Sequence, residues 1–125
     1  MAKIFIIEDD NFLNSAYEIK FKALGHTVHI ETTGEQVEAK IKEAHPDIIV
    51  LDLILPKING IDILKGIKKN PDISKIPVVI STNIGFADDM GECMTLGAVD
   101  YFIKSDIPLD KLVSKIIEDI TPPEN

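Results

Sequence analysis

The sequence predicts an α/β fold in which helices cover both faces of a parallel sheet. Short apolar runs alternate about five times with segments of helical periodicity, as expected for repeated β-α units. The apolar runs are mostly aliphatic and the chain has no Trp, which suits strands that are buried on both faces. With 125 residues and no internal repeat, the chain is predicted to form one domain.

The first half of the chain is predicted to contain three strands and two helices. Asp10 or Asn11 can cap the first helix, and Gly25 is placed to end it. Thr33 followed by Gln36 has the spacing of a capping box, which predicts the start of the second helix. The apolar face of that helix consists of Val37, Ile41 and Ala44. The other expected elements are a strand at about 3–7, a helix at about 11–24, and strands at about 27–31 and 47–51.

The second half is predicted to contain three helices and two strands. The loop 85–89 has an acidic helix start, and Gly97 is placed to end that helix. The remaining expected elements are a helix at about 61–69 that buries Ile61, Leu64 and Ile67 or their neighbours, a strand that leads to Thr82, a strand at 100–104 and a helix at about 109–120. The domain is expected to span 1–121, with a frayed tail at 122–125 and no output domain.

Charge and composition narrow the classes of function. The formal net charge of −8 argues against DNA binding, which requires clustered positive charge. Cys93 is the only cysteine, so no internal disulfide can form, and this favours a reducing compartment. No apolar run approaches the length that spans a membrane, and Met1 is followed almost directly by a strand rather than by a signal peptide. We therefore expect a cytoplasmic protein that does not associate with membranes.

Polar side chains follow four of the predicted strands. Glu8 and Asp9 follow the first strand, Asp52 follows the third, Thr82 ends the fourth, and Lys104 ends the fifth. In an open parallel sheet, ligands bind beyond the carboxyl ends of the strands, where these side chains would meet. Several carboxylates gathered at one edge repel one another, and a hard divalent cation such as Mg²⁺ would relieve that repulsion.

This set of side chains suits phosphoryl chemistry on an aspartate. A carboxylate can attack a phosphoryl donor and hold the group as an acyl phosphate. Mg²⁺ bound to neighbouring carboxylates neutralises the charge that develops during transfer. A hydroxyl can donate a hydrogen bond to one phosphoryl oxygen, and a Lys ammonium can contact another.

Five segments resemble the receiver domain of bacterial two-component response regulators, and together they cover nearly the whole chain. The resemblance implies a flavodoxin-like (βα)5 fold, a doubly wound parallel five-stranded sheet with strand order 2-1-3-4-5. The segments are Ile6-Ile7-Glu8-Asp9-Asp10, residues 47–56 (Asp47 to Pro56), Asn59-Gly60, residues 77–82 (Pro77 to Thr82), and residues 97–104 (Gly97 to Lys104).

The resemblance also implies roles for individual residues at the acidic site. Asp52 would accept a phosphoryl group from the phosphohistidine of a sensor histidine kinase or a phosphotransfer protein. Asp9 would bind Mg²⁺, or Mn²⁺ in its place, directly together with Asp52. Glu8 would act through water, and Ile54 would lend its backbone carbonyl.

The same resemblance implies a switch. Thr82 and Lys104 would contact the phosphoryl group, and Tyr101 would be the aromatic residue that changes orientation on activation. The output would be altered binding to a downstream protein that the sequence does not identify. Apart from its own aspartyl phosphorylation and dephosphorylation, the protein would not act as an enzyme.

Three residues depart from the family pattern. Ser105 stands where a Pro usually follows the Lys, and Asn83 stands where a small residue usually follows the Thr. Asp10 adds a third acid, which can cap the first helix instead of binding metal. We expect the Lys104-Ser105 peptide to be trans, because a cis bond before a residue other than Pro costs roughly 3–4 kcal/mol.

Three alternative functions can be compared with a working receiver. A haloacid dehalogenase-type phosphatase needs a second acid two residues after its nucleophile, where this chain has Ile54. A flavodoxin must hold the FMN phosphate in its first loop, where Glu8, Asp9 and Asp10 would repel it. The alternative left open is a degenerate receiver that binds partners without phosphorylation, since the usual Pro is missing.

Overall fold

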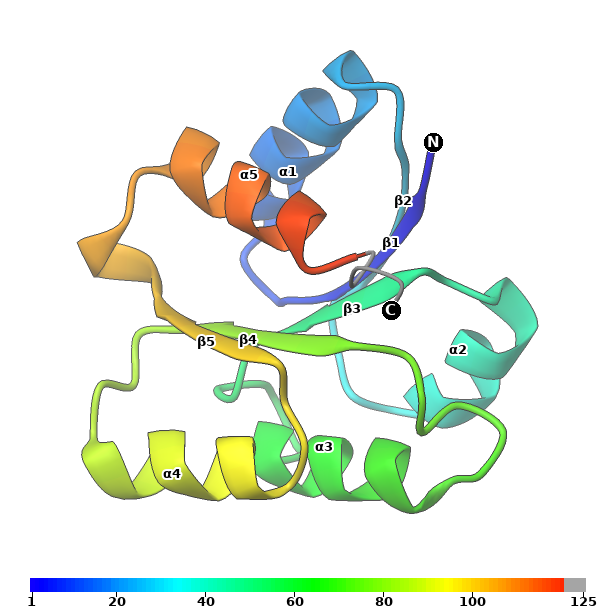
Figure 1. Cartoon of the computed structure of the whole chain (residues 1–125), viewed down its shortest axis with the longest axis vertical. Coiled ribbons are helices and arrows are strands. Elements are labelled where there is room, and N and C mark those ends of the chain that lie inside the picture. The colour runs from blue at the N-terminus through cyan, green and yellow to red at the C-terminus, as the bar shows by residue number, and fades with distance from the viewer. Residues whose placement is uncertain (121–125) are drawn as a thin grey trace, which may run out of the picture.

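The computed structural model describes residues 1–120, which form five parallel strands and five α-helices (Figure 1). The expected tail at 122–125 and residue 121 lie outside the described residues. The elements are β1 (Lys3–Ile7), α1 (Asn11–Ala23), β2 (Thr27–Glu31), α2 (Val37–Ala44), β3 (Ile48–Leu51), α3 (Gly60–Lys69), β4 (Val78–Thr82), α4 (Ala87–Thr95), β5 (Asp100–Ile103), a 3-10 turn η1 (Lys104–Asp106) and α5 (Leu109–Glu118).

The strands lie in the order β2-β1-β3-β4-β5, and every neighbouring pair is parallel. This order and the five flanking helices confirm the predicted flavodoxin-like fold. From β1 the chain adds β2 on one side and then β3, β4 and β5 on the other side. The helices that follow the neighbouring strands β1 and β3 therefore lie on opposite faces of the sheet. Such a switch point is where open α/β sheets form their ligand crevice.

Alternate residues of each central strand pack on opposite faces of the sheet. In β1, Ile4 and Ile6 pack with side chains of α1 and α5, whereas Phe5 and Ile7 pack with side chains of α2, α3 and α4. Figure 1 shows α1 and α5 on one side of the sheet and α3 and α4 on the other. The period of two along a strand therefore produces two aliphatic cores, one on each face.

The start of α1 is capped by Asp10. One carboxylate oxygen of Asp10 accepts hydrogen bonds from the backbone N–H groups of Phe12 and Leu13, at 3.0 and 3.1 Å. Gly25, just beyond the helix, has a φ of 89°, which a residue without a Cβ adopts easily. Of the two caps that the sequence allowed, the structure has Asp10 in that role.

The predicted capping box of α2 is wrong. Gln36 precedes the helix with a left-handed φ of 57° and makes no capping hydrogen bond with its side chain. The Thr33 hydroxyl instead accepts a hydrogen bond from the Glu35 backbone N–H at 3.3 Å, within the preceding turn. A left-handed residue between that turn and the helix breaks the reciprocal pairing that a capping box requires. The apolar face was predicted well, since Val37 and Ile41 are buried and Ala44 is half-buried.

Other boundaries differ by one or two residues from those predicted. β3 begins at Ile48, and the preceding Asp47 accepts a hydrogen bond from the Lys3 backbone N–H with its carboxylate at 2.8 Å. α3 begins at Gly60, one residue early, and its buried side chains are Ile63, Leu64 and Ile67, with Ile61 only half-buried. β5 ends at Ile103, before η1, and α5 ends at Glu118.

The carboxyl group of Asp119, just beyond α5, predicts a pH dependence of stability. Burial, followed by a hydrogen bond with Asp100, raises the Asp119 pKa from 3.8 to about 6. A raised pKa means that the folded state favours the protonated acid, so its stabilising effect is lost as the pH rises through about 6. We expect Asp119→Asn to raise the melting temperature at about pH 7.5 and to change it little at about pH 5. Asp88→Asn, at an exposed position on α4 (Ala87–Thr95), is the control, and equal shifts of Asp119→Asn at both pH values would contradict the prediction.

Candidate functional site

The ends of β1 and β3 place two carboxylates side by side. The Glu8 N–H donates to the Glu31 carbonyl at 3.0 Å, and the Asp52 N–H donates to the Ile7 carbonyl at 3.0 Å. These bonds continue the sheet ladder by one residue beyond the strands, so the backbone that carries each acid is held rigidly. Glu8 and Asp52 are only 2% and 4% exposed, which makes their charges costly unless they are paired.

Lys104 lies between the two buried acids. Its ammonium Nζ is 2.8 Å from Glu8 Oε1 and 2.9 Å from Asp52 Oδ2. Burial raises the pKa of Glu8, and the nearby charge of Asp52 adds to that rise, although the bond from Lys104 opposes it. Burial lowers the pKa of Lys104, but its hydrogen bonds to the two carboxylates outweigh this and raise the pKa overall. The ammonium is therefore positively charged at neutral pH and partly balances the acids.

Backbone N–H groups orient both acids further. Glu8 Oε2 accepts a hydrogen bond from the Asp10 N–H at 3.0 Å, and Asp52 Oδ1 accepts one from the Ile54 N–H at 3.1 Å. Both oxygens of each buried carboxylate therefore have a partner. The Ile54 side chain is 58% exposed, so the loop after β3 covers Asp52 with its backbone and not with that side chain.

The acid cluster fits a divalent cation. Glu8, Asp9 and Asp52 each offer a carboxylate oxygen, and these oxygens lie within 4.8 Å of one another. Carboxylate oxygens are the hard ligands that Mg²⁺ or Mn²⁺ prefers. Because Asp9 is exposed, the cluster is open to solvent on that side. Asp10, by contrast, faces the start of α1 as its cap.

A close contact with Gly60 holds the loop after Asp52. The Gly60 N–H donates to the Leu53 carbonyl at 3.0 Å. A Cβ at Gly60 would lie 2.4 Å from Leu53 Cα and 2.6 Å from the Asp52 carbonyl oxygen, closer than atoms can approach. Glycine is therefore required at position 60, which gives a physical reason for a residue that the sequence analysis named only as part of the family resemblance.

Thr82 and Tyr101 lie on the neighbouring strands β4 and β5 and are joined through Ile84. The fully buried Thr82 accepts a long hydrogen bond of 3.4 Å from the Ile84 N–H with its hydroxyl oxygen. The Tyr101 hydroxyl donates to the Ile84 carbonyl at 2.6 Å, and burial raises the Tyr101 pKa to about 12. The two residues predicted to form the switch thus contact the same loop residue, Ile84.

Two residues that depart from the family pattern are hydrogen-bonded to each other. The Ser105 backbone N–H donates to the Asn83 side-chain oxygen at 3.0 Å, which joins the loops after β4 and β5. Residues 1–120 contain no cis peptide bond, so Lys104-Ser105 is trans as expected. Sequence reasoning identified Asn83 and Ser105 separately but missed the bond between them. It also missed Asn14, whose buried side-chain amide donates to the Glu8 carbonyl at 2.8 Å.

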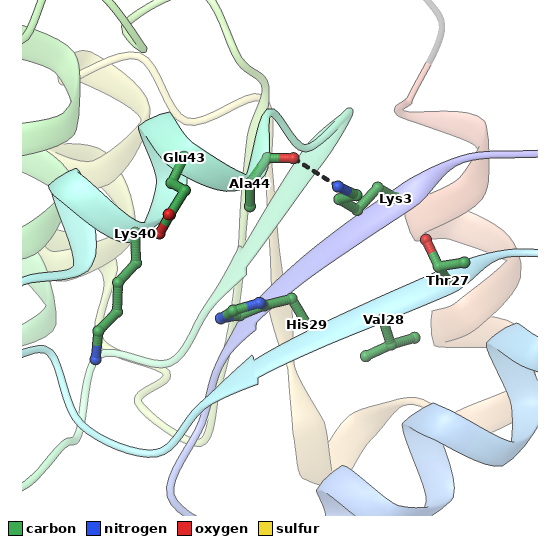
Figure 2. A pocket seen from close by; sticks show the side chains of 7 residues that line it. All are labelled: Lys3, Thr27, Val28, His29, Lys40, Glu43 and Ala44. Atoms are coloured by element: carbon green, nitrogen blue, oxygen red, sulfur yellow. Dashed lines mark hydrogen bonds between the residues drawn. The ribbon is translucent and has the colours of Figure 1, made fainter.

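A separate hollow of about 360 Å³ lies beside α2, near the starts of β1 and β2 (Figure 2). The cations that line it already have protein partners. Lys3 donates to the Ala44 carbonyl at 2.7 Å, and Lys40 donates to Glu31 at 2.9 Å. His29 stacks on Phe5 with ring centroids 4.6 Å apart. This hollow has no carboxylate cluster among its lining residues, so the acid site at the ends of β1 and β3 is the better candidate for chemistry.

None of the helices in the described part of the chain has the length and hydropathy needed to cross a membrane.

Several known proteins are similar to this chain. It is 27% identical over 104 residues to the phosphate regulon transcriptional regulatory protein PhoB of Rhizobium meliloti, covering 83% of this chain and 46% of that protein. It is 31% identical to the DNA-binding dual master transcriptional regulator RpaA of Synechocystis, covering 83% of this chain and 43% of that protein. The chain thus spans less than half the length of these two curated relatives.

Among solved structures, the Mn²⁺-bound form of response regulator Rcp1 is 30% identical to this chain. The match covers 99% of this chain and 100% of that one, with a TM-score of 0.84. The family model of the response regulator receiver domain matches residues 4–117, which is nearly the whole described chain and includes every residue of the acid cluster. The chain therefore belongs to the response regulator receiver domain family.

Proposed function

We propose that this domain is a signalling switch in which Asp52 accepts a phosphoryl group with the help of Mg²⁺ or Mn²⁺. Its membership of the receiver family supports a phosphorylatable switch. The observation that carries the assignment to Asp52 is its position: a buried carboxylate, 2.9 Å from Lys104, with Glu8 and Asp9 close enough to share a cation. The Mn²⁺-bound form of Rcp1, which is 30% identical to this chain, supports a cation at such a site.

The proposed transfer is a displacement at phosphorus. An oxygen of Asp52 forms the new bond to phosphorus, the bond between phosphorus and the imidazole nitrogen of a phosphohistidine breaks, and that nitrogen keeps the electron pair. Lys104 moves its ammonium from the carboxylate to a phosphoryl oxygen, and the Thr82 hydroxyl donates to another. Glu8, Asp9 and Asp52 would hold the cation, with the Ile54 carbonyl as a further ligand, and the bound cation would supply the positive charge that balances the phosphoryl oxygens.

The proposed donor is a sensor histidine kinase or a phosphotransfer protein, and the proposed output is altered binding to a downstream protein in the cytoplasm. The domain promotes only its own phosphorylation and dephosphorylation. A degenerate receiver that works without phosphorylation is not favoured, because the acids and the Lys are all present and Lys104 reaches both buried acids.

Labelling by a small phosphoryl donor tests this proposal. Native protein is incubated with acetyl phosphate, with Mg²⁺ or with a chelator, and its intact mass is measured. We expect one added phosphoryl group in the presence of Mg²⁺ and none with the chelator. Protein that stays unlabelled with Mg²⁺ would instead indicate the degenerate, phosphorylation-independent module.

The switch face predicted from Thr82 and Tyr101 can be tested with beryllofluoride, a mimic of the phosphoryl group. If Thr82 moves toward the phosphoryl group, its contact with Ile84 changes, and Ile84 also holds the Tyr101 hydroxyl at 2.6 Å. We expect backbone NMR shifts on loading to concentrate in residues 82–110, which contain α4 and β5. Shifts confined to α2 would contradict this prediction.

The side chains of Ile54 and Ile84, two residues beyond Asp52 and Thr82, predict a long-lived phosphoryl group. Neither side chain can orient a water molecule for hydrolysis, because neither has a hydrogen-bonding group. We expect Ile54→Asn or Ile84→Glu to speed the loss of phosphate several-fold in a decay assay. Ile19→Asn is the matched control, since Ile19 is 69% exposed on α1. Unchanged decay in both site variants would contradict the prediction that these two positions slow hydrolysis.

A further inference from the structure

Asn83 and Ser105 extend the pairing of β4 and β5 beyond the point where the backbone ladder stops. The last paired residues are Thr82 and Ile103. Asn83 is the next residue on one strand, and Ser105 lies two residues on from the other. The 3.0 Å bond from the Ser105 N–H to Asn83 Oδ1 adds a side-chain link across this gap. The loops after β4 and β5 are therefore joined directly.

The bond requires an acceptor side chain at position 83 and a residue other than Pro at position 105. Ser105 lies in η1 (Lys104–Asp106), and the first N–H groups of a helical turn have no acceptor within the turn. Asn83 Oδ1 supplies that acceptor, and a backbone N–H can face only the oxygen of the amide and not its nitrogen. A Pro at position 105 would have no N–H to donate, and an Ala at position 83 would have no acceptor.

The bond between Asn83 and Ser105 restrains the backbone next to Lys104. Lys104 begins η1, and its side chain reaches back to Glu8 Oε1 and Asp52 Oδ2. A lysine side chain has four flexible carbons, so the position of its ammonium depends on how firmly its backbone is held. On the other side of the link, Asn83 directly follows Thr82. The bond thus connects the two residues that would contact the phosphoryl oxygens.

We propose that Asn83 is a positioning residue, which through the Ser105 N–H holds Lys104 at Asp52 and couples its position to that of Thr82. The inference rests on the proposed function for its effect on phosphorylation, but the positioning itself is a property of the unphosphorylated protein. Asn83 does not contact Asp52 in this arrangement and acts only through Ser105 and Lys104.

Three variants separate the bond from the rest of the two side chains. Asn83→Ala removes the acceptor. Asn83→Asp keeps an oxygen at the same place and serves as the conservative rescue. Ser105→Ala removes the hydroxyl but keeps the backbone N–H, so it is the matched control. The exposed position of Asn83 and Ser105 makes all three variants compatible with folding, which a thermal melt checks.

Two readouts use the unphosphorylated protein. The first is the hydrogen exchange of the residue 105 amide, and the second is the NMR signal of the Lys104 ammonium, which its two carboxylate partners should protect from exchange. We expect Asn83→Ala to lose both, and Asn83→Asp and Ser105→Ala to keep both. Fast exchange of the Ser105 amide in native protein, or a Lys104 signal unaffected by Asn83→Ala, would overturn the inference.

The third readout is the rate of labelling by acetyl phosphate with Mg²⁺. Loss of one hydrogen bond of ordinary strength should slow labelling of Asn83→Ala about fivefold, while Ser105→Ala labels at the native rate. Equal rates for native protein and Asn83→Ala would overturn the positioning role. If native protein takes no label, the proposed function fails, and the amide and ammonium signals still decide whether Asn83 positions Lys104.

Discussion

Asp52→Asn is expected to eliminate stable phosphorylation while the protein remains folded. The substitution keeps the shape of the side chain but removes the charged oxygen that would attack phosphorus. Among the described residues, Asp52 alone is a buried carboxylate that follows β3, contacts Lys104 and shares the cluster with Glu8 and Asp9. Intact mass after incubation with acetyl phosphate and Mg²⁺ measures the effect.

The fold should tolerate this change because two effects on stability oppose each other. Lys104 loses one charged partner, but the repulsion between Asp52 and Glu8, which raises the Glu8 pKa, is also removed. We expect a melting temperature within a few degrees of the native value. Asp62→Asn, at an exposed position on α3, is the control and should be labelled normally. Native stoichiometry of label in Asp52→Asn, or a melt far below that of native protein, would show that the account of the site is wrong.

Asp9→Ala is expected to weaken binding of Mg²⁺ or Mn²⁺ about tenfold or more, and Asp10→Ala to weaken it little. Asp9 offers an exposed carboxylate oxygen to the cluster, whereas Asp10 accepts hydrogen bonds from Phe12 and Leu13 at the start of α1. Calorimetric titration, or paramagnetic broadening by Mn²⁺, measures the affinity of each variant.

The stabilities of the two variants should rank in the opposite order to their losses of metal affinity. Asp10→Ala removes a helix cap and should destabilise the protein by about 1 kcal/mol, measured by denaturant unfolding. Asp9→Ala removes an exposed negative charge from a crowded acidic cluster and should not destabilise it. Equal losses of affinity in the two variants would mean that Asp10 is also a ligand, and that its role as a cap does not keep it from the metal.

The fold was predictable because its signals are local. Four of the strands are short apolar runs that end in or lead to an acidic, hydroxyl or Lys side chain, so the sequence alone predicts Asp52 and Lys104 at one edge of the sheet. The start of α2 was not predictable in the same way. Gln36 adopts a left-handed conformation there, and its side chain carries no signal for a positive φ.

The bond between Asn83 and Ser105 illustrates a second limit. Both residues were visible as departures from the family pattern, but they are 22 positions apart in the chain. Their contact depends on the register of β4 against β5, with Thr82 opposite Ile103, and on the turn that begins at Lys104. The family resemblance implies the order of the strands, but it does not give the side-chain bonds that such a register allows.

Identification of the phosphorylated residue is the most direct test of the central claim. Protein labelled with acetyl phosphate and Mg²⁺ is treated with borohydride, which reduces an aspartyl phosphate to homoserine, and the modified residue is located by peptide mass spectrometry. The account predicts homoserine at position 52, in the peptide that follows β3, and at no other acid of the cluster. Homoserine at position 9 or 10, or a labelled protein in which Asp52 is unmodified, would contradict it.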